Sequence, residues 1–171
     1  MDLKKKIRDV PGFPRPGITF RDITPLLLDP GAMEQAVDEM AGFARSLGVE
    51  IVVAAEARGF ILGGALARQL GAGFVPARKP GRLPSETVSV EYELEYGLDE
   101  LHLHADAFGS GAKVLVHDDL IATGGTAEAV VKIVEGLGGE VVGCGFLIEL
   151  SGLRGRDRLS PHEVHSLIRY D

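Results

Sequence analysis

The chain has 171 residues, a length that suits one domain with a single core of sheet and helices. Its 45% apolar and 25% charged residues are typical of a folded soluble protein, so disorder is not expected. The formal net charge of -7 argues against broad contact with nucleic acid or an anionic membrane. An anionic ligand would therefore need a local site, helped by a metal cation.

The basic start and the cysteine content bear on the compartment. Lys4 to Lys6 are followed by charged residues and Pro11, so we expect a solvated first helix and no apolar run for a signal peptide or a membrane span. Cys144 is the only cysteine, which excludes an internal disulfide. It lies in an apolar stretch and is expected to be inert core packing. Together these features indicate the cytoplasm.

The first half of the chain alternates helical and strand patterns. Asp29 can cap a helix that has Pro30 in its first turn and apolar residues at helical spacing up to Leu47. A short apolar strand is predicted at 50–55, a helix at 59–70 and a second strand at 73–77. The sequence therefore predicts a strand-helix-strand unit.

The second half continues this rhythm after one excursion. Residues 78–84 carry two prolines, a glycine and three cations, which favours an exposed loop. Alternating residues at 87–92 and 100–105 predict two strands joined around 95–99, a flap that could move. A strand at 113–116, a helix at 124–137, a strand at 141–150 and a final loop and strand at 151–171 complete the prediction. We expect an α/β fold over 1–171, a single domain with a mainly parallel sheet flanked by helices.

The most informative stretch is 114–126, where an apolar strand runs through two carboxylates and small residues into a helix. Backbone N–H groups at a helix start favour an anion, and Gly124 and Gly125 let a ligand approach closely. Asp118 and Asp119 can accept hydrogen bonds from ribose hydroxyls. The residues expected to hold a sugar 5-phosphate are Ala122, Thr123, Gly124, Gly125 and Thr126.

This stretch is neither a Walker loop nor a dinucleotide fingerprint, because it lacks Gly-Lys-Ser/Thr and Gly-x-Gly-x-x-Gly. It resembles the signature with which type I phosphoribosyltransferases bind phosphoribosyl diphosphate (PRPP). The resemblance implies their fold, including a flexible hood loop.

Four further segments resemble the family of phosphoribosyltransferases that act on adenine. Residues 13–25, Phe-Pro-Arg-Pro-Gly-Ile-Thr-Phe-Arg-Asp-Ile-Thr-Pro, resemble its adenine-binding segment. Phe20 and Arg21 take the positions where a ring stacks on the base and the backbone reads its edge. On burial preference alone, core packing is a second and less favoured interpretation of Phe20.

Two segments resemble the pyrophosphate-binding parts of that family. In Ala54-Ala-Glu-Ala-Arg-Gly-Phe60, Arg58 would meet anionic oxygens, and a strained peptide bond is expected. In 78–84, Arg78 and Lys79 would do so, in part across a dimer. Arg82 stands where the family usually has lysine, so its role is less secure.

Residues 91–97, Glu-Tyr-Glu-Leu-Glu-Tyr-Gly, resemble the hood that closes over the reacting atoms. The resemblance assigns catalysis to Glu95 and Tyr96 together with Arg58, with Glu95 as the acid at the base N7. On the residues alone, Glu95 would be one acid among several on a solvated strand. The segment 146–159 also resembles the family, but it receives no chemical role.

Three histidines need an interpretation. His117 replaces an aliphatic residue of the family pattern. It could perturb Asp118, but a hydrogen-bonded histidine at the end of a strand is the favoured interpretation. His102 and His104 alternate with leucines and are expected to be solvated, because no further ligands follow at zinc spacing.

The resemblance implies transfer of a 5-phosphoribosyl group from PRPP to adenine, giving AMP and pyrophosphate in purine salvage. It also implies a cytoplasmic homodimer that uses Mg2+ chelated by substrate oxygens, with no residue assigned as a metal ligand. Neither nucleic acid nor a membrane is expected as a partner. Two alternatives stay open: transfer to another base such as a 6-oxopurine, and a non-catalytic PRPP sensor.

Overall fold

The computed structural model describes residues 1–94 and 97–171. Its centre is a five-stranded sheet in the order β4-β3-β7-β8-β9, and every pair of neighbouring strands is parallel. The strands are β3 (Ile51–Ala55), β4 (Gly73–Ala77), β7 (Lys113–Ile121), β8 (Glu140–Leu150) and β9 (Val164–Tyr170). The α/β prediction with a mainly parallel sheet is confirmed.

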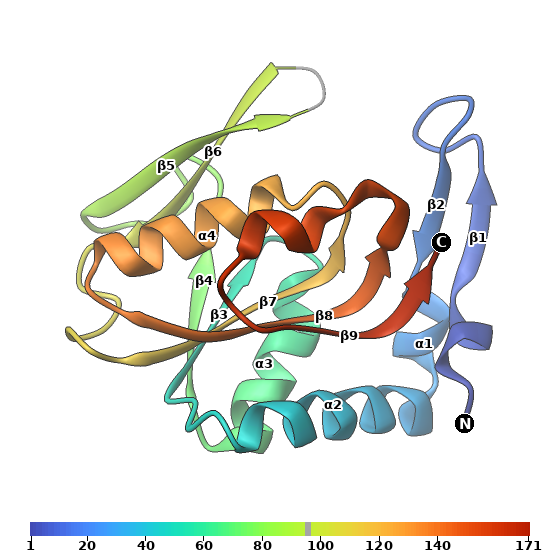
Figure 1. Cartoon of the computed structure of the whole chain (residues 1–171), viewed down its shortest axis with the longest axis horizontal. Helices are drawn as coiled ribbons and strands as arrows, with labels where there is room; N and C mark the ends of the chain where they lie inside the picture. The colour runs from blue at the N-terminus through green and yellow to red at the C-terminus, as the bar shows by residue number, and fades with distance from the viewer. Residues whose placement is uncertain (95–96) are drawn as a thin grey trace.

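Helices cover both faces of this sheet (Figure 1). The α-helices are α1 (Thr24–Leu28), α2 (Pro30–Arg45), α3 (Gly59–Leu70) and α4 (Gly125–Gly136). Asp29 caps α2 by accepting hydrogen bonds from the N–H groups of Gly31 and Ala32 at 3.0 and 3.2 Å. Gly71 ends α3 in the left-handed conformation, with φ 67°. The predicted start of α2 and both ends of α3 are confirmed.

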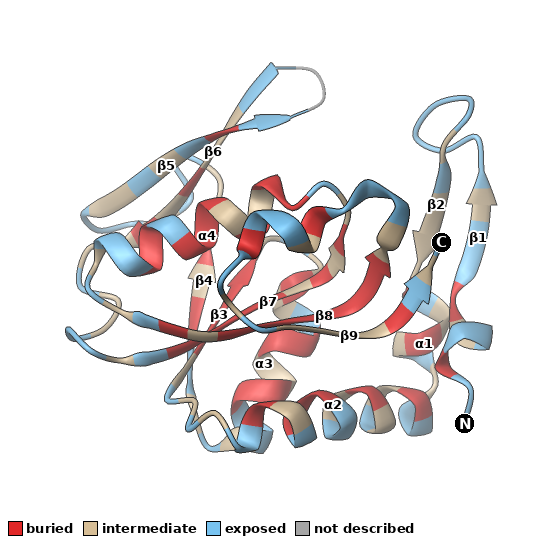
Figure 2. Cartoon of the chain, in the orientation of Figure 1, coloured by how far each residue is buried: buried red, intermediate tan, exposed pale blue. Residues whose placement is uncertain are grey.

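The inner strands are buried on both faces, which explains their unbroken apolar runs. Val53 and Val116 belong to the core under α4, whereas Val52 and Leu115 belong to the core under α2 and α3. In Figure 2 the buried residues accordingly follow β3, β7 and β8 between the helical layers.

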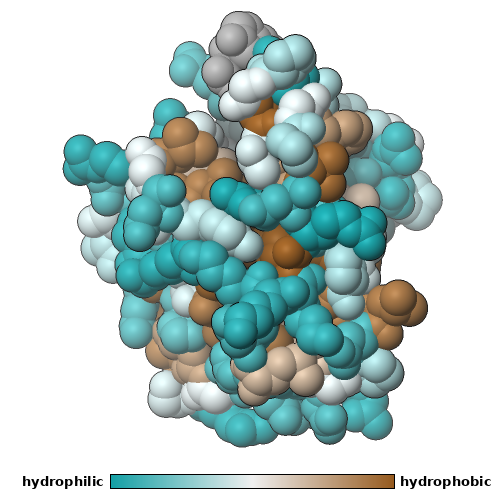
Figure 3. All heavy atoms as spheres, turned by 90° about the vertical axis from the view of Figure 1, so that its right-hand side faces the viewer, coloured by the Kyte–Doolittle hydropathy of each residue, from teal (hydrophilic) through white to brown (hydrophobic). Residues whose placement is uncertain are grey.

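Two antiparallel hairpins extend from this core (Figure 1). The first pairs β1 (Arg8–Pro11) with β2 (Thr19–Asp22), and the second pairs β5 (Thr87–Leu94) with β6 (Gly97–His104). Among the described residues, the short 3-10 helices are η1 (Leu3–Lys6), η2 (Ser151–Leu153) and η3 (Gly155–Leu159). The face that carries the first hairpin is largely hydrophilic, with scattered apolar residues (Figure 3).

Two expectations need correction, and one hairpin was not expected from the sequence. The strand predicted at 113–116 continues to Ile121 because β8 is long enough to pair with all of it, so Asp118 and Asp119 lie within β7. The hairpin of β1 and β2 was not predicted. His102 and His104 are half-buried rather than solvated, because β6 lies over the chain after β4, and the His102 Nδ1 atom is 3.0 Å from the Thr87 hydroxyl.

Within the described residues, no helix combines the length and the apolar character that crossing a membrane requires.

Candidate active site

The segment after β7 forms a cradle at the start of α4. Gly124 is the N-cap of α4 with φ 85°, and no side-chain hydrogen bond caps this helix within the described part of the chain. The backbone N–H groups of its first turn are therefore available to an anion. Residues Leu120 to Ala127 and Asp118 line a hollow of about 160 Å³ there. All five residues predicted to hold a phosphate, Ala122 to Thr126, line this hollow.

Glycine is required at this turn for a second reason besides its positive φ. A Cβ atom on Gly124 would lie 2.4 Å from the carbonyl oxygen of Gly155, which is closer than any real contact. A Cβ atom on Gly155 would lie 2.3 Å from the carbonyl oxygen of Ala122. The two backbones touch because neither residue carries a side chain.

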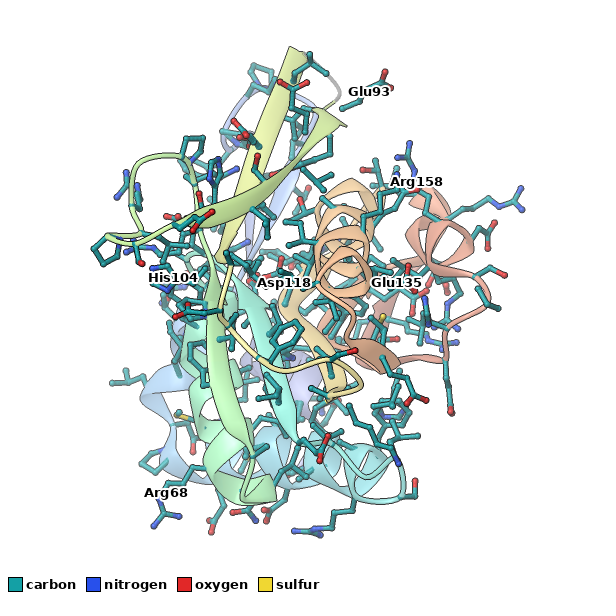
Figure 4. The ribbon with its side chains drawn as sticks, turned by 90° about the vertical axis from the view of Figure 1, so that its left-hand side faces the viewer. Arg68, Glu93, His104, Asp118, Glu135 and Arg158 are labelled. Carbon is teal, nitrogen blue, oxygen red and sulfur yellow. The ribbon has the colours of Figure 1, made fainter. Side chains whose placement is uncertain are left out.

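The paired acids lie just upstream of the cradle. Asp118 accepts a hydrogen bond from the backbone N–H of Asp119 at 2.8 Å, and Asp119 is 4% exposed. Figure 4 shows Asp118 in the interior of the molecule, where β7 lies between its neighbours. Gly59 permits this position, since a Cβ atom there would lie 2.8 Å from the Asp118 Oδ1 atom.

Burial and mutual repulsion disfavour two charges at this place. Burial, followed by the charge of Asp119, raises the pKa of Asp118 well above its ordinary value. Burial also raises the pKa of Asp119, but the Arg58 guanidinium opposes this shift. His117, the preceding residue, has its pKa lowered to about 4 by burial, so its ring is neutral at neutral pH.

Arg58 connects the paired acids with the first hairpin. Its Nε atom lies 3.0 Å from the Asp119 Oδ2 atom, and its guanidinium lies 4.7 Å from the centroid of the Phe20 ring. Phe20 also meets Phe13 edge to face at 5.2 Å. Arg21, by contrast, turns its side chain to Asp9 and to the Tyr170 ring. Phe20, Arg58 and the two acids are thus assembled, while the Arg21 side chain is engaged elsewhere.

Glu56 organises the basic segment after β4. The peptide bond between Glu56 and Ala57 is cis, in the segment where an unusual bond was expected. The Glu56 carboxylate lies 3.6 Å from the Arg78 Nε atom and 3.9 Å from the Arg82 Nε atom, and it accepts a hydrogen bond from the backbone of Lys79. Glu56 belongs to the segment 54–60 that resembles a pyrophosphate loop, but the sequence pattern predicts no role for it.

Lys79 joins this basic segment to the second hairpin. Its ammonium group contacts the Asp99 carboxylate and lies 3.0 Å from the Tyr92 hydroxyl. Burial disfavours the charged form, but the hydrogen bonds to Asp99 and Tyr92 outweigh it and raise the pKa of Lys79. Asp99 and Tyr92 were not predicted, because only the pairing of β5 with β6 brings them together.

The second hairpin also reaches the cradle. A Cβ atom on Gly125 would lie 3.2 Å from the carbonyl oxygen of Glu93, near the end of β5. Figure 4 places Glu93 near the outer end of this hairpin and Arg158 beside α4. Of the three residues assigned to catalysis, Arg58 lies at the site, and Glu95 and Tyr96 lie outside the described residues.

This geometry defines a class of protein. A parallel sheet with paired acids in one strand, followed by an uncapped, glycine-rich helix start, is the arrangement of a phosphoribosyltransferase. Accordingly, the family model of the phosphoribosyl transferase domain matches residues 27–168.

Closer relatives narrow the class. An adenine phosphoribosyltransferase of Thermotoga sp. (strain RQ2) is 56% identical over 170 residues, which cover 99% of this chain and 100% of the relative. The solved adenine phosphoribosyltransferase of Thermoanaerobacter pseudethanolicus is 48% identical with a TM-score of 0.96, covering 99% of this chain and 98% of that one. The enzyme of Saccharomyces cerevisiae, solved with adenine and an imino-altritol bisphosphate, is 37% identical with a TM-score of 0.92, covering 96% of both chains. The chain belongs to the adenine phosphoribosyltransferase family.

Proposed function

We propose that this chain transfers the 5-phosphoribosyl group of PRPP to adenine, giving AMP and pyrophosphate in purine salvage. The observation that carries the proposal is the junction of β7 and α4, where Asp118 and Asp119 lie directly before an uncapped helix start. A ribose 5-phosphate carries hydroxyls that can donate hydrogen bonds to such carboxylates and a phosphate monoester that the N–H groups of a helix start can bind. The relatives supply the identity of the base.

The mechanism assigns the paired acids to the ribose. As pyrophosphate leaves the anomeric carbon, positive charge develops on the sugar ring. Asp118 and Asp119 would orient the hydroxyls and stabilise this charge, and Ala122 to Thr126 would hold the 5-phosphate. Arg58, Arg78 and Lys79 would neutralise the departing pyrophosphate.

The base would lie against the first hairpin. Phe20 would stack on adenine and the backbone of Arg21 would read its edge, since β2 presents both in extended conformation. Adenine would attack through N9 while Glu95, with Tyr96 beside it, donates a hydrogen bond or proton to N7.

Magnesium fits this site as a hydrated ion held mainly by substrate oxygens. In the described part of the chain, no three His, Cys, Asp or Glu side chains converge as a metal site, whereas Mg2+ needs only one or two carboxylates. Asp118, which lines the cradle hollow, and its neighbour Asp119 would be the carboxylates available to such an ion. When bound, the ion would neutralise charge on pyrophosphate.

We also propose one domain over 1–171, a homodimer and a cytoplasmic location.

The direct test of this function is pyrophosphate release from PRPP and Mg2+ with adenine, hypoxanthine, guanine, xanthine and orotate in parallel. We expect turnover with adenine alone. Turnover with another base only would retain the fold and refute the adenine assignment, and no turnover with any of the five would favour a PRPP sensor.

Replacing Phe20 with leucine should weaken adenine binding selectively. A lost stacking contact is worth about 0.5–1.5 kcal/mol, so KM for adenine should rise by about 3–10-fold. KM for PRPP should stay within about twofold, since the cradle is built by β7 and α4. Steady-state kinetics with each substrate varied in turn measures both constants. Phe74→Leu, on β4, is the matched control, and equal effects of the two variants would contradict the stacking role.

Replacing Glu95 with glutamine should lower kcat because an amide cannot protonate the base. General acid catalysis typically contributes about 10²–10⁴-fold, so we expect a loss in that range at unchanged KM for PRPP. Glu91→Gln, an exposed acid on β5, is the control and should retain full activity. A Glu95→Gln variant with normal kcat between pH 6 and 9 would remove Glu95 from the mechanism.

A further inference from the structure

The segment after β8 received no chemical role from the sequence, yet it touches the phosphate cradle. Gly155, the first residue of η3, is buried against the carbonyl oxygen of Ala122 and the backbone nitrogen of Gly124. Figure 1 shows this segment beside α4, and Leu159 of η3 packs into the core under that helix. Gly155 therefore supports the backbone of the cradle at Ala122 and Gly124.

The residue next to Gly155 is anchored in the sheet. The Arg156 guanidinium donates two hydrogen bonds to Glu149, from Nε and Nη2, each 2.6 Å long. Such a bidentate pair fixes both the distance and the orientation of the guanidinium. Arg156 thus ties the start of η3 to a defined point of β8.

Glu149 links the start of η3 to the strand that leads into the cradle. It is 3% exposed and pairs across the sheet with Ile121, the last residue of β7 before the cradle. Ser166 of β9 donates a hydrogen bond to it, and the Arg169 Nε atom lies 3.3 Å from its Oε2 atom. The hydrogen bonds of Arg156, together with these groups, lower the pKa of Glu149 to about 2. The carboxylate is therefore charged throughout the usual assay range.

We infer that Glu149 and Arg156 are positioning residues for the site of the 5-phosphate: their ion pair holds Gly155 against Ala122 and Gly124. Glu149 binds Arg156, and Arg156 is bonded to Gly155, which contacts the cradle. Glu149 also pairs with Ile121, the residue of β7 that leads into the cradle. This inference rests on the proposed function. It adds two residues that contact neither the cradle hollow nor the reacting atoms.

The test compares Arg156→Met, Arg156→Lys and Glu149→Gln with Arg154→Met. Arg154 is the matched control. It forms an ion pair with Asp157 in the same turn, but this pair is exposed and does not include Glu149. We expect Arg156→Met and Glu149→Gln to raise the Kd for ribose 5-phosphate and the KM for PRPP about tenfold, through misplacement of the cradle. KM for adenine should change less than about twofold. Arg156→Lys keeps the positive charge but cannot form the bidentate hydrogen bonds, so its Kd and KM values should lie between those of the wild type and Arg156→Met.

Calorimetric binding of ribose 5-phosphate separates the outcomes, because it needs no turnover. If the wild-type chain binds and Arg156→Met binds equally well, the positioning role is refuted and the proposed function is untouched. Equal rises of both KM values, or an equal effect of Arg154→Met, would also refute it, as they indicate general loosening. A wild-type chain that does not bind ribose 5-phosphate would refute the proposed function and this inference together. Should Arg156→Met not fold, the comparison of Arg156→Lys with Arg154→Met gives the same decision.

Discussion

Replacing Gly124 with alanine is expected to lower kcat/KM for PRPP by at least about a hundredfold, the cost of displacing a binding group by about 1 Å. Two independent effects act together at this residue. Its φ of 85° is strained for any residue with a side chain, and the new Cβ atom would meet the Gly155 carbonyl oxygen at 2.4 Å. The cradle must therefore open, which moves the N–H groups away from the phosphate. Initial rates at varied PRPP concentration measure the effect.

Gly136→Ala is the matched control for this variant. Gly136 ends the same helix, has open space around the position of a Cβ atom and does not adopt a positive φ. Alanine is favoured over glycine in a helix by about 1 kcal/mol, so this variant should be active and no less stable. Normal PRPP kinetics in Gly124→Ala would show that the phosphate does not bind at the start of α4.

Replacing Asp118 with asparagine should give a less active but more stable protein. Removing one preorganised charge from a developing cation typically costs on the order of 10²–10³-fold in kcat. The same carboxylate is buried beside a second one, so its charged form destabilises the fold. We expect Tm to rise by about 2–4 °C, the shift that about 1 kcal/mol gives a domain of this size. Kinetics and thermal unfolding at pH 7.5 measure the two effects.

The pH dependence of this stabilisation follows from the direction of the pKa shift. The pKa of Asp118 is raised in the folded state, so the folded chain holds the proton more tightly than the unfolded chain. Above the raised pKa, the charged carboxylate destabilises the fold to the full extent. As the pH falls through the raised pKa towards the ordinary value of 3.8, this destabilisation disappears. The gain in Tm of Asp118→Asn should therefore shrink with falling pH. Asp106→Asn, an exposed acid after β6, should show no such gain. A gain in Tm that is equal at all pH values would contradict the raised pKa of Asp118.

Local patterns predicted the elements whose chemistry is local. The cap at Asp29, the apolar runs of β3 and β7 and the glycine-rich start of α4 each follow from neighbouring residues, and the structure confirms them. The end of β7 was placed too early because Asp118 and Asp119 interrupt its apolar run. Only the length of the partner strand β8 keeps them in the sheet.

Contacts between distant segments could not be predicted in this way. Lys79 meets Asp99 because two hairpin strands pair, and Gly155 meets Gly124 because both lack a side chain. Neither relation leaves a periodic signal in the sequence. Glu149 and Arg156 lie only seven residues apart, but their pairing depends on the turn through η2. The site residues were thus found by motif, whereas the residues that hold them in place required the structure.

A crystal structure of the chain with AMP tests the central claim most directly. We predict that the phosphate accepts hydrogen bonds from backbone N–H groups at the start of α4. The ribose hydroxyls should lie on Asp118 and Asp119, and the adenine ring should lie against Phe20. A phosphate bound instead by Arg78 and Lys79, or a base remote from the β1–β2 hairpin, would contradict the proposed site.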